Sequence, residues 1–176
     1  MSTSLNACTL DTAIKISRAW GKRNGGRFKI IARYQGYHGA TLGGVSLTGQ
    51  TLRRLDFEPL LPGVVHVQAP YFYRSSAKDE EELTDRCIEE LDSVIRYQGP
   101  ETVAAFIAEP IIGGGGVILP PRNYLKRIRE VCDRYGVLMI CDEVITGFGR
   151  TGELFASDFF DVQPDIMTMA KGLSSG

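Results

Sequence analysis

Three short runs of mostly apolar residues constrain the fold of this chain more than any other feature. They span residues 103–108 (VAAFIA), 137–141 (VLMIC) and 166–170 (IMTMA). A strand that is apolar on both of its faces must be covered on both, as are the strands of parallel sheets flanked by helices. An amphipathic stretch at 123–135, which predicts a helix, separates the first two runs. This alternation predicts an α/β domain with a largely parallel sheet and flanking helices.

The rest of the chain continues the alternation of helices and strands. Residues 78–98 are strongly amphipathic, with acidic residues concentrated at the N-terminal end of the stretch. Further strands are expected at 28–32 and 64–67. Further helices are expected at 11–20, at 78–98 and from about residue 40 to 47. Gly21 would end the first of these helices.

The composition excludes several kinds of protein. The 176 residues are the usual size of one domain, and 43% of them are hydrophobic, which is enough for a packed core. The formal net charge of −1 gives no electrostatic reason to expect a nucleic acid or an anionic membrane as partner. No apolar run reaches the roughly 20 residues of a membrane span, and the N-terminus lacks the pattern of a signal peptide.

The cysteines and histidines do not indicate a metal site. The cysteines are Cys8, Cys87, Cys132 and Cys141; none forms a CxxC pair, and no histidines occur at metal-ligand spacing. Cys132 and Cys141 lie in apolar stretches, so we expect buried, reduced thiols. Reduced thiols suit a reducing compartment, so we expect a cytoplasmic protein, or a mitochondrial one if the source is eukaryotic.

Chemically active side chains follow four of the predicted strands. In open α/β sheets, ligands gather at the carboxyl ends of the strands. Each residue alone has a simpler explanation, since a lysine there is usually a solvated surface group and an acid is usually a cap. Their convergence on one edge favours a binding site. The residues are Tyr37 and His38 after the first strand, then Glu109, Asp142 and Lys171 after the last three.

This set of side chains suits a site that transfers amino groups with an aldehyde cofactor. Lys171 would hold the aldehyde as an imine. Asp142, at the end of an apolar strand, would keep a pyridine nitrogen protonated. Tyr37 and Val144 are available to cover the two faces of the ring.

Longer motifs around these residues resemble the class III (omega) aminotransferases, which use pyridoxal 5'-phosphate. The resemblance covers nearly all of residues 9–176, and the last two motifs at this spacing are very specific. It implies the central part of the large domain of fold type I pyridoxal-phosphate-dependent transferases. The motifs are Tyr37-His38-Gly39-Ala40-Thr41, Ala108-Glu109-Pro110, Asp142-Glu143-Val144-Ile145-Thr146-Gly147-Phe148-Gly149-Arg150-Thr151-Gly152 and Ala170-Lys171-Gly172.

The resemblance implies a role for each matching residue. Lys171 matches the lysine that forms the Schiff base with the cofactor and later moves a proton between substrate and cofactor carbons. Asp142 matches the partner of the pyridinium nitrogen, and Glu109 the acid beside substrate and cofactor. Tyr37 and Val144 match the residues that pack on the two ring faces.

Two features of the motifs have simpler interpretations. His38 belongs to the cofactor-binding motif, and a hydrogen-bonded structural histidine is the simpler explanation of it. Residues 113–116 are all glycine and indicate a tight backbone passage rather than a phosphate cradle, because the context and the lysine of a P-loop are absent. No GxGxxG follows an early strand, so a nucleotide-binding domain is a weak alternative.

The sequence departs from the family pattern near its beginning. The phosphate-binding turn of the family, roughly S-G-S/T-E-A, should precede Asp11. Residues 3–10 read TSLNACTL instead and lack the glycine and the glutamate. Helix N-termini bind phosphate through free backbone N–H groups. Ser4 or Thr9, near the start of the first helix, would be only a weak replacement for the missing turn.

The chain also stops five residues after Lys171. We therefore expect residues 1–176 to be a partial cofactor-binding large domain, divergent at 1–10, without the C-terminal part and the small domain. The resemblance implies a homodimer for the full-length protein, in which both subunits contribute to each site. The isolated chain is expected to be inactive.

The leading hypothesis is a transaminase that moves an amino group from an omega-amino acid or amine to a 2-oxo acid. The segment 47–67 looks most like the pyruvate-linked members of the family, so pyruvate is the favoured acceptor. The alternative is a catalytically dead remnant that folds and associates with a full-length paralogue.

Overall fold

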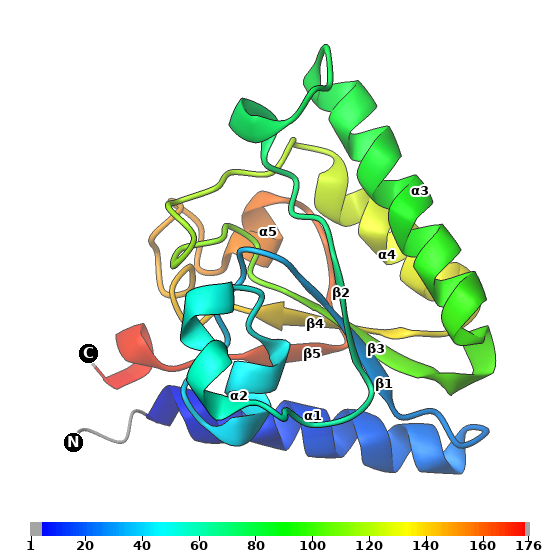
Figure 1. The fold of residues 1–176 in the computed structure, drawn as a ribbon. Coiled ribbons are helices and arrows are strands. Elements are labelled where there is room, and N and C mark those ends of the chain that lie inside the picture. The colour runs from blue at the N-terminus through cyan, green and yellow to red at the C-terminus, as the bar shows by residue number, and fades with distance from the viewer. Residues whose placement is uncertain (1–4, 175–176) are drawn as a thin grey trace.

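The protein consists of a parallel sheet between two layers of helices (Figure 1). The structure is a computed structural model that describes residues 5–174, and the side chains of residues 9–173. The strands are β1 (Lys29–Arg33), β2 (Val64–Val67), β3 (Val103–Ala108), β4 (Leu138–Asp142) and β5 (Ile166–Thr168). Their order in the sheet is β2-β1-β3-β4-β5, and every neighbouring pair is parallel.

Helices cover both faces of this sheet. The helices α1 (Leu5–Arg23) and α2 (Leu42–Leu47) lie on one face, and α3 (Glu80–Gln98) and α4 (Tyr124–Tyr135) lie on the other (Figure 1). The short helix α5 (Ala156–Phe159) precedes β5. Short 3-10 helices span Thr51–Arg53, Leu55–Phe57, Phe72–Arg74, Pro100–Thr102 and Lys171–Ser174. The expected α/β architecture with a parallel sheet is confirmed.

Each face of the sheet has its own apolar core, because successive side chains of a strand point to opposite faces. Phe106 of β3 belongs to the core under α3 and α4, together with Leu91 and Leu125. Its neighbour Ile107 belongs to the core under α1, together with Leu10. Every residue of β3 is buried, which explains why this central strand is apolar throughout.

Most helix limits follow from end signals in the sequence. The side chain of Asp79 accepts a hydrogen bond from the amide of Glu82 and so caps α3, and acidic residues fill the first turn. The helix α4 ends at Gly136, whose φ of 60° is left-handed and favours glycine.

The prediction that Gly21 ends the first helix is wrong. The helix α1 continues through Gly21 to Arg23. Gly21 is needed inside the helix for another reason: an ideal Cβ there would lie 2.2 Å from the carbonyl oxygen of Arg27. The glycine therefore allows a close backbone contact, and the turn that follows it brings the chain back to β1.

The winding of the sheet creates a crevice at its carboxyl edge. The chain passes from β1 outward to β2, and then crosses back over β1 to form β3. The crevice between β1 and β3 is thus the point at which the direction of winding reverses. Open α/β sheets bind their ligands at this kind of crevice.

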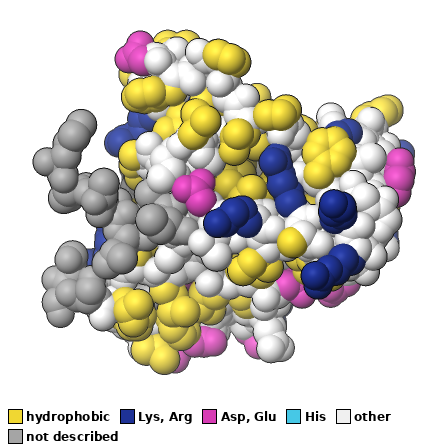
Figure 2. Space-filling view, turned by 90° about the horizontal axis from the view of Figure 1, so that it is seen from below, with side chains coloured by type: hydrophobic (Ala, Val, Ile, Leu, Met, Phe, Trp, Pro, Cys, Tyr) yellow, Lys and Arg dark blue, Asp and Glu magenta, His cyan; other side chains and the backbone are white. Residues whose placement is uncertain are grey.

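The surface on the α1 side is mixed in character. Figure 2 shows lysine and arginine side chains beside apolar ones, with some acidic side chains on the same face. The residues that α1 exposes include Lys15, Ile16, Lys22 and Arg23. Within the part of the chain that the structure describes, no helix is both long and apolar enough to cross a bilayer.

Candidate functional site

A pocket lies at the carboxyl ends of β1, β3 and β4, in the crevice where the winding reverses. Its volume is about 370 Å³, including the part that is open to solvent. The structure brings together in this pocket all the side chains that the sequence indicated as a site. It is lined by Leu10, Tyr37, His38, Gly39, Glu109, Asp142, Val144, Ile145 and Lys171.

Three lining residues were not among the predicted site residues. Gly39 and Ile145 belong to the motifs of the site, so those motifs could have indicated them. Leu10 belongs to α1, and its residue type does not mark it as a site residue. Its place in the pocket results from the packing of α1 against the sheet.

Lys171 lies just beyond β5, at the start of the 3-10 helix Lys171–Ser174. Lys171 is exposed, and it is the only lysine among the described residues that line the pocket. The next residue, Gly172, lies against Phe148, with an ideal Cβ only 2.9 Å from the Cβ of Phe148. A primary amine at this position is accessible to a carbonyl compound that enters the pocket.

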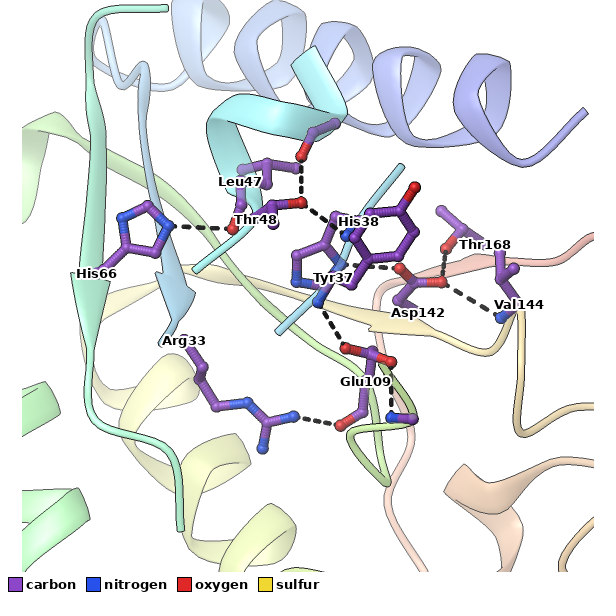
Figure 3. Close-up of polar contacts among 12 residues, drawn as sticks. Arg33, Tyr37, His38, Leu47, Thr48, His66, Glu109, Asp142, Val144 and Thr168 are labelled. Atoms are coloured by element: carbon purple, nitrogen blue, oxygen red, sulfur yellow. Dashed lines mark hydrogen bonds and ion pairs between the residues drawn. The ribbon is translucent and has the colours of Figure 1, made fainter. Parts of the chain in front are cut away.

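Asp142 ends β4 and is only 3% exposed. Its Oδ2 lies 2.8 Å from Nδ1 of His38, and its Oδ1 accepts hydrogen bonds from the Thr168 hydroxyl at 3.1 Å and from the Val144 amide at 3.2 Å (Figure 3). The bond to the Val144 amide is a local cap, which is the simpler role that the sequence also allowed for this acid. The other two contacts come from distant elements and fix the orientation of the carboxylate in the pocket.

His38 is buried and connects two parts of the site. Its backbone amide donates a hydrogen bond of 3.0 Å to the hydroxyl of Thr48, which donates to the carbonyl of Gly44 at 2.9 Å (Figure 3). The imidazole contacts Asp142, as described above. His38 is therefore a hydrogen-bonded structural histidine and, at the same time, a residue that orients the buried acid.

Glu109, the residue after β3, is buried, and its carboxylate binds two backbone amides. Oε1 accepts a hydrogen bond from the amide of Tyr37 at 2.9 Å, and Oε2 accepts one from the amide of Gly113 at 3.0 Å (Figure 3). Burial is the main influence on this carboxyl group and raises its pKa, while the neighbouring His38 and the two amides act in the opposite direction. The carboxylate thus joins the two loops that flank the pocket.

Tyr37 is partly buried, and a cation lies over its ring. The guanidinium carbon of Arg53 lies 4.6 Å from the centre of the Tyr37 ring. An ideal Cβ on Gly114 would lie 3.1 Å from the Cβ of Tyr37, so the glycine run packs closely behind the tyrosine. Arg53 and the glycine run restrict the orientation of Tyr37 in the pocket wall.

The glycine run forms a tight hairpin, closed by the antiparallel bridge between Ile112 and Ile118. An ideal Cβ on Gly113 would lie 2.6 Å from Cδ1 of Ile145, and one on Gly115 would lie 2.6 Å from the carbonyl oxygen of Gln35. The contact at Gly115 is with backbone and leaves no room for a side chain, whereas at Gly113 the end of the Ile145 side chain would have to shift. Gly115 is therefore required for close backbone packing, which agrees with the tight backbone passage that the sequence indicated.

Glu143 is a structural residue of the site that the sequence interpretation did not single out. Its carboxylate is buried and accepts hydrogen bonds from the amides of Ala156 and Ser157, at 3.1 and 2.7 Å, and from the hydroxyl of Thr146. These contacts tie the start of α5 to the end of β4. The loop between them begins with Val144 and Ile145, so Glu143 supports one wall of the pocket.

The residues of the pocket fit the ring end of a pyridine aldehyde cofactor. They supply one primary amine, one oriented buried carboxylate, and an aromatic and a branched apolar side chain as ring cover. The fit of a phosphate group depends on residues near the start of α1. Ser4 lies outside the described residues, and Thr9 lines a separate groove between α1 and β5.

The fold and the lining of the pocket match those expected for the large domain of the pyridoxal-phosphate-dependent transferases. The family model of aminotransferase class-III matches residues 4–176. The chain belongs to the class III aminotransferases.

Relatives of known sequence or structure agree with this assignment. The chain is 46% identical over 171 residues to the probable gamma-aminobutyrate transaminase 2, mitochondrial, of Oryza sativa subsp. indica. It is 47% identical to the (S)-enantioselective omega-transaminase of Thermomicrobium roseum, with a TM-score of 0.94. It is 40% identical to an amine transaminase from an uncultivated Pseudomonas species in its PLP-bound form, with a TM-score of 0.95. Pyridoxal phosphate is accordingly the cofactor of this family.

The chain spans only part of these relatives. The rice protein is matched over 94% of this chain but only 34% of its own length. Each of the two solved structures is matched over 99% of this chain and 40% of its own chain.

Proposed function

We propose that residues 1–176 are part of the cofactor-binding large domain of a transaminase. Its reaction moves an amino group from an omega-amino acid or amine to a 2-oxo acid such as pyruvate. The observation that carries the proposal is that Lys171 and Asp142, an amine and an oriented acid, line the same pocket. The names of the rice and Thermomicrobium relatives, a gamma-aminobutyrate transaminase and an omega-transaminase, support this donor class.

When bound, pyridoxal phosphate supplies an aldehyde carbon that accepts the amino group and a ring that delocalises the electron pair left on the substrate carbon. Lys171 holds the cofactor through Nζ. As a free amine, its Nζ would move a proton between the substrate and the cofactor. The exposed position of Lys171 at the pocket edge suits both tasks.

The acidic residues and the ring cover act on the cofactor ring in different ways. Asp142 keeps the pyridine nitrogen protonated, and the contacts from His38 and Thr168 hold its carboxylate in the orientation that this requires. Tyr37 and Val144, which line the pocket, would cover the ring and exclude water from its faces. Glu109 lies beside them and fixes the loop that carries Tyr37.

We propose that the activity belongs to a longer protein and that the isolated chain does not turn over substrate. Support comes from the short share of its relatives that the chain spans and from residues 3–10, which lack the family's phosphate-binding turn. Exposed apolar side chains at Leu42, Leu52 and Phe57 support contacts with further parts of the protein or with the second subunit of a homodimer. The alternative, a remnant that associates with a full-length paralogue, uses the same surface.

We place the protein in the cytoplasm, or in mitochondria if its source is eukaryotic. Cys87, Cys132 and Cys141 are free and buried. Burial raises the pKa of Cys87 to about 11 and that of Cys132 to about 12, so these thiols stay protonated and unreactive at neutral pH. Unpaired thiols suit a reducing compartment.

The test of this function is reductive trapping with borohydride in the presence of pyridoxal phosphate, followed by peptide mass spectrometry. It is done on the chain and on a version extended to the length of its relatives. We expect the label on Lys171 and none after Lys171→Ala. Lys126→Arg is the matched control, because Lys126 lies outside the pocket and its ion pair with Asp161 is retained. His38→Ala should leave cofactor bound, with lower affinity.

A label on any lysine other than Lys171 would refute the assignment. Turnover of amine and pyruvate by the extended protein supports the enzyme over the remnant. Turnover by the isolated chain would refute the proposal that it is inactive.

A further inference from the structure

The most deeply buried arginine of the described chain lies next to the site and has few polar partners. Arg33 is the last residue of β1 and is 1% exposed. Its Nη2 donates a hydrogen bond to the main-chain oxygen of Glu109 (Figure 3), whereas Nε and Nη1 have no hydrogen-bond partner among the described residues. The guanidinium carbon lies 5.6 Å from the centre of the Tyr124 ring, which adds a cation–π contact.

Burying a cation in this way is costly. None of the ion pairs formed by the described residues includes Arg33. A buried charge without an ionic partner loses its hydration and recovers only part of it through the Glu109 carbonyl, the Tyr124 hydroxyl and the Tyr124 ring. Methionine has a similar shape and would be buried here without that cost. Methionine would, however, leave the main-chain oxygen of Glu109 without this donor, so the particular contribution of an arginine here is that contact.

The hydrogen bond of Arg33 to Glu109 leads directly to the pocket. It holds the main chain of Glu109 at the point where β3 ends. The carboxylate of the same residue accepts the amides of Tyr37, in the loop after β1, and of Gly113, in the glycine hairpin. Any rotation of the Glu109 main chain would change the direction of its side chain and so move one of these two loops away from the other.

We propose that Arg33 is a positioning residue of this site: it fixes the main chain of Glu109, and thereby the carboxylate that joins the Tyr37 loop to the glycine hairpin. Arg33 binds the main-chain oxygen of Glu109 and not its carboxylate, so it acts by fixing the position of the main chain. Its effect on the reaction rests on the proposed function, in which Tyr37 covers the cofactor ring. Its effect on the two loops does not depend on that function.

The experiment is amide hydrogen exchange by NMR on the chain without cofactor, comparing wild type with Arg33→Met and Arg33→Lys. The amides of Tyr37 and Gly113 report on their hydrogen bonds to the Glu109 carboxylate. The amide of Leu91, inside α3, reports on the whole fold. In Arg33→Met we expect exchange at Tyr37 and Gly113 to accelerate at least about tenfold relative to Leu91, the size expected when a charge-assisted hydrogen bond is lost. Arg33→Lys, which keeps a donor, should restore part of the protection.

Unchanged exchange at both loop amides in Arg33→Met would overturn the proposal, and so would equal acceleration of all three amides, which would mean a purely structural role. If Arg33→Met does not fold, the unmodified chain still provides a test. A scalar coupling across the hydrogen bond from Nη2 of Arg33 to the carbonyl carbon of Glu109 is then expected, and its absence would contradict the inference. Because no cofactor is present, this measurement and the trapping of Lys171 can fail independently.

Discussion

Replacing Glu143 by alanine should destabilise the protein more than any other change of an acidic residue in the loop after β4. Glu143 is 1% exposed, and its carboxylate accepts the amides of Ala156 and Ser157 and the hydroxyl of Thr146. Glu143→Ala removes the only acceptor that the structure provides for these two amides. Both amides belong to buried residues, so water does not easily replace the lost carboxylate.

The magnitude follows from the number of donors left without a partner. A buried donor that loses its acceptor costs about 1–3 kcal/mol, so the two amides together cost about 2–6 kcal/mol. Relief from burying a charged carboxylate offsets part of this, which gives a net loss of about 3 kcal/mol. In a domain of this size, 1 kcal/mol corresponds to about 2–4 °C, so the midpoint of thermal unfolding should fall by about 6–12 °C.

Thermal unfolding followed by circular dichroism measures this effect, with Glu153→Ala as the control. Glu153 lies in the same loop but is exposed, so its replacement should change stability by less than about 0.5 kcal/mol. If the two variants unfold within about 2 °C of each other, which corresponds to less than about 1 kcal/mol, the carboxylate of Glu143 does not anchor α5 and the reasoning fails.

Two further predictions concern the pocket walls. Burial raises the pKa of Glu109, so the folded protein favours the protonated carboxyl group and ionisation of Glu109 opposes folding. The stability that the protonated group contributes is complete below the ordinary pKa of 4.5. It is lost as pH rises through the higher pKa of the folded state. Urea unfolding from pH 4 upward should therefore show wild type losing stability relative to Glu109→Gln, and parallel pH profiles would contradict this. Gly115→Ala should be more destabilising than Gly114→Ala, by about 1 kcal/mol or more. A Cβ at position 115 would lie 2.6 Å from the backbone oxygen of Gln35, whereas one at position 114 would lie 3.1 Å from the Cβ of Tyr37. Equal unfolding midpoints for the two variants would refute this.

The strands and the location of the site could be predicted because their physical causes are local. A run such as 103–108 is apolar on both faces only if helices cover both, and the structure places it at the centre of the sheet. Parallel strands end at the same edge, so the residues that follow them must gather there. The limits of individual elements were less predictable. Gly21 resembles a helix end in sequence, yet the packing of the Arg27 carbonyl against it requires a glycine inside the helix.

The contacts that give the site its geometry could not be predicted, because they join residues far apart in the chain. The pair His38 and Asp142 is separated by 104 positions, and the contact between Arg33 and Glu109 by 76. No periodicity or spacing reports on such a pair. The sequence therefore identified His38 and Glu109 as members of a site without showing which atoms they hold.

The α/β alternation, the family, and the edge of the sheet on which amine and acid gather follow from the order of residue types along each strand or motif. It is the packing of separate elements that makes Glu109 bind two loops, lets Glu143 anchor α5, and buries a cation at position 33 without an ion pair among the described residues. Those outcomes depend on how separate elements pack, because a buried polar atom is satisfied or left unpaired by whatever distant group comes within hydrogen-bonding distance.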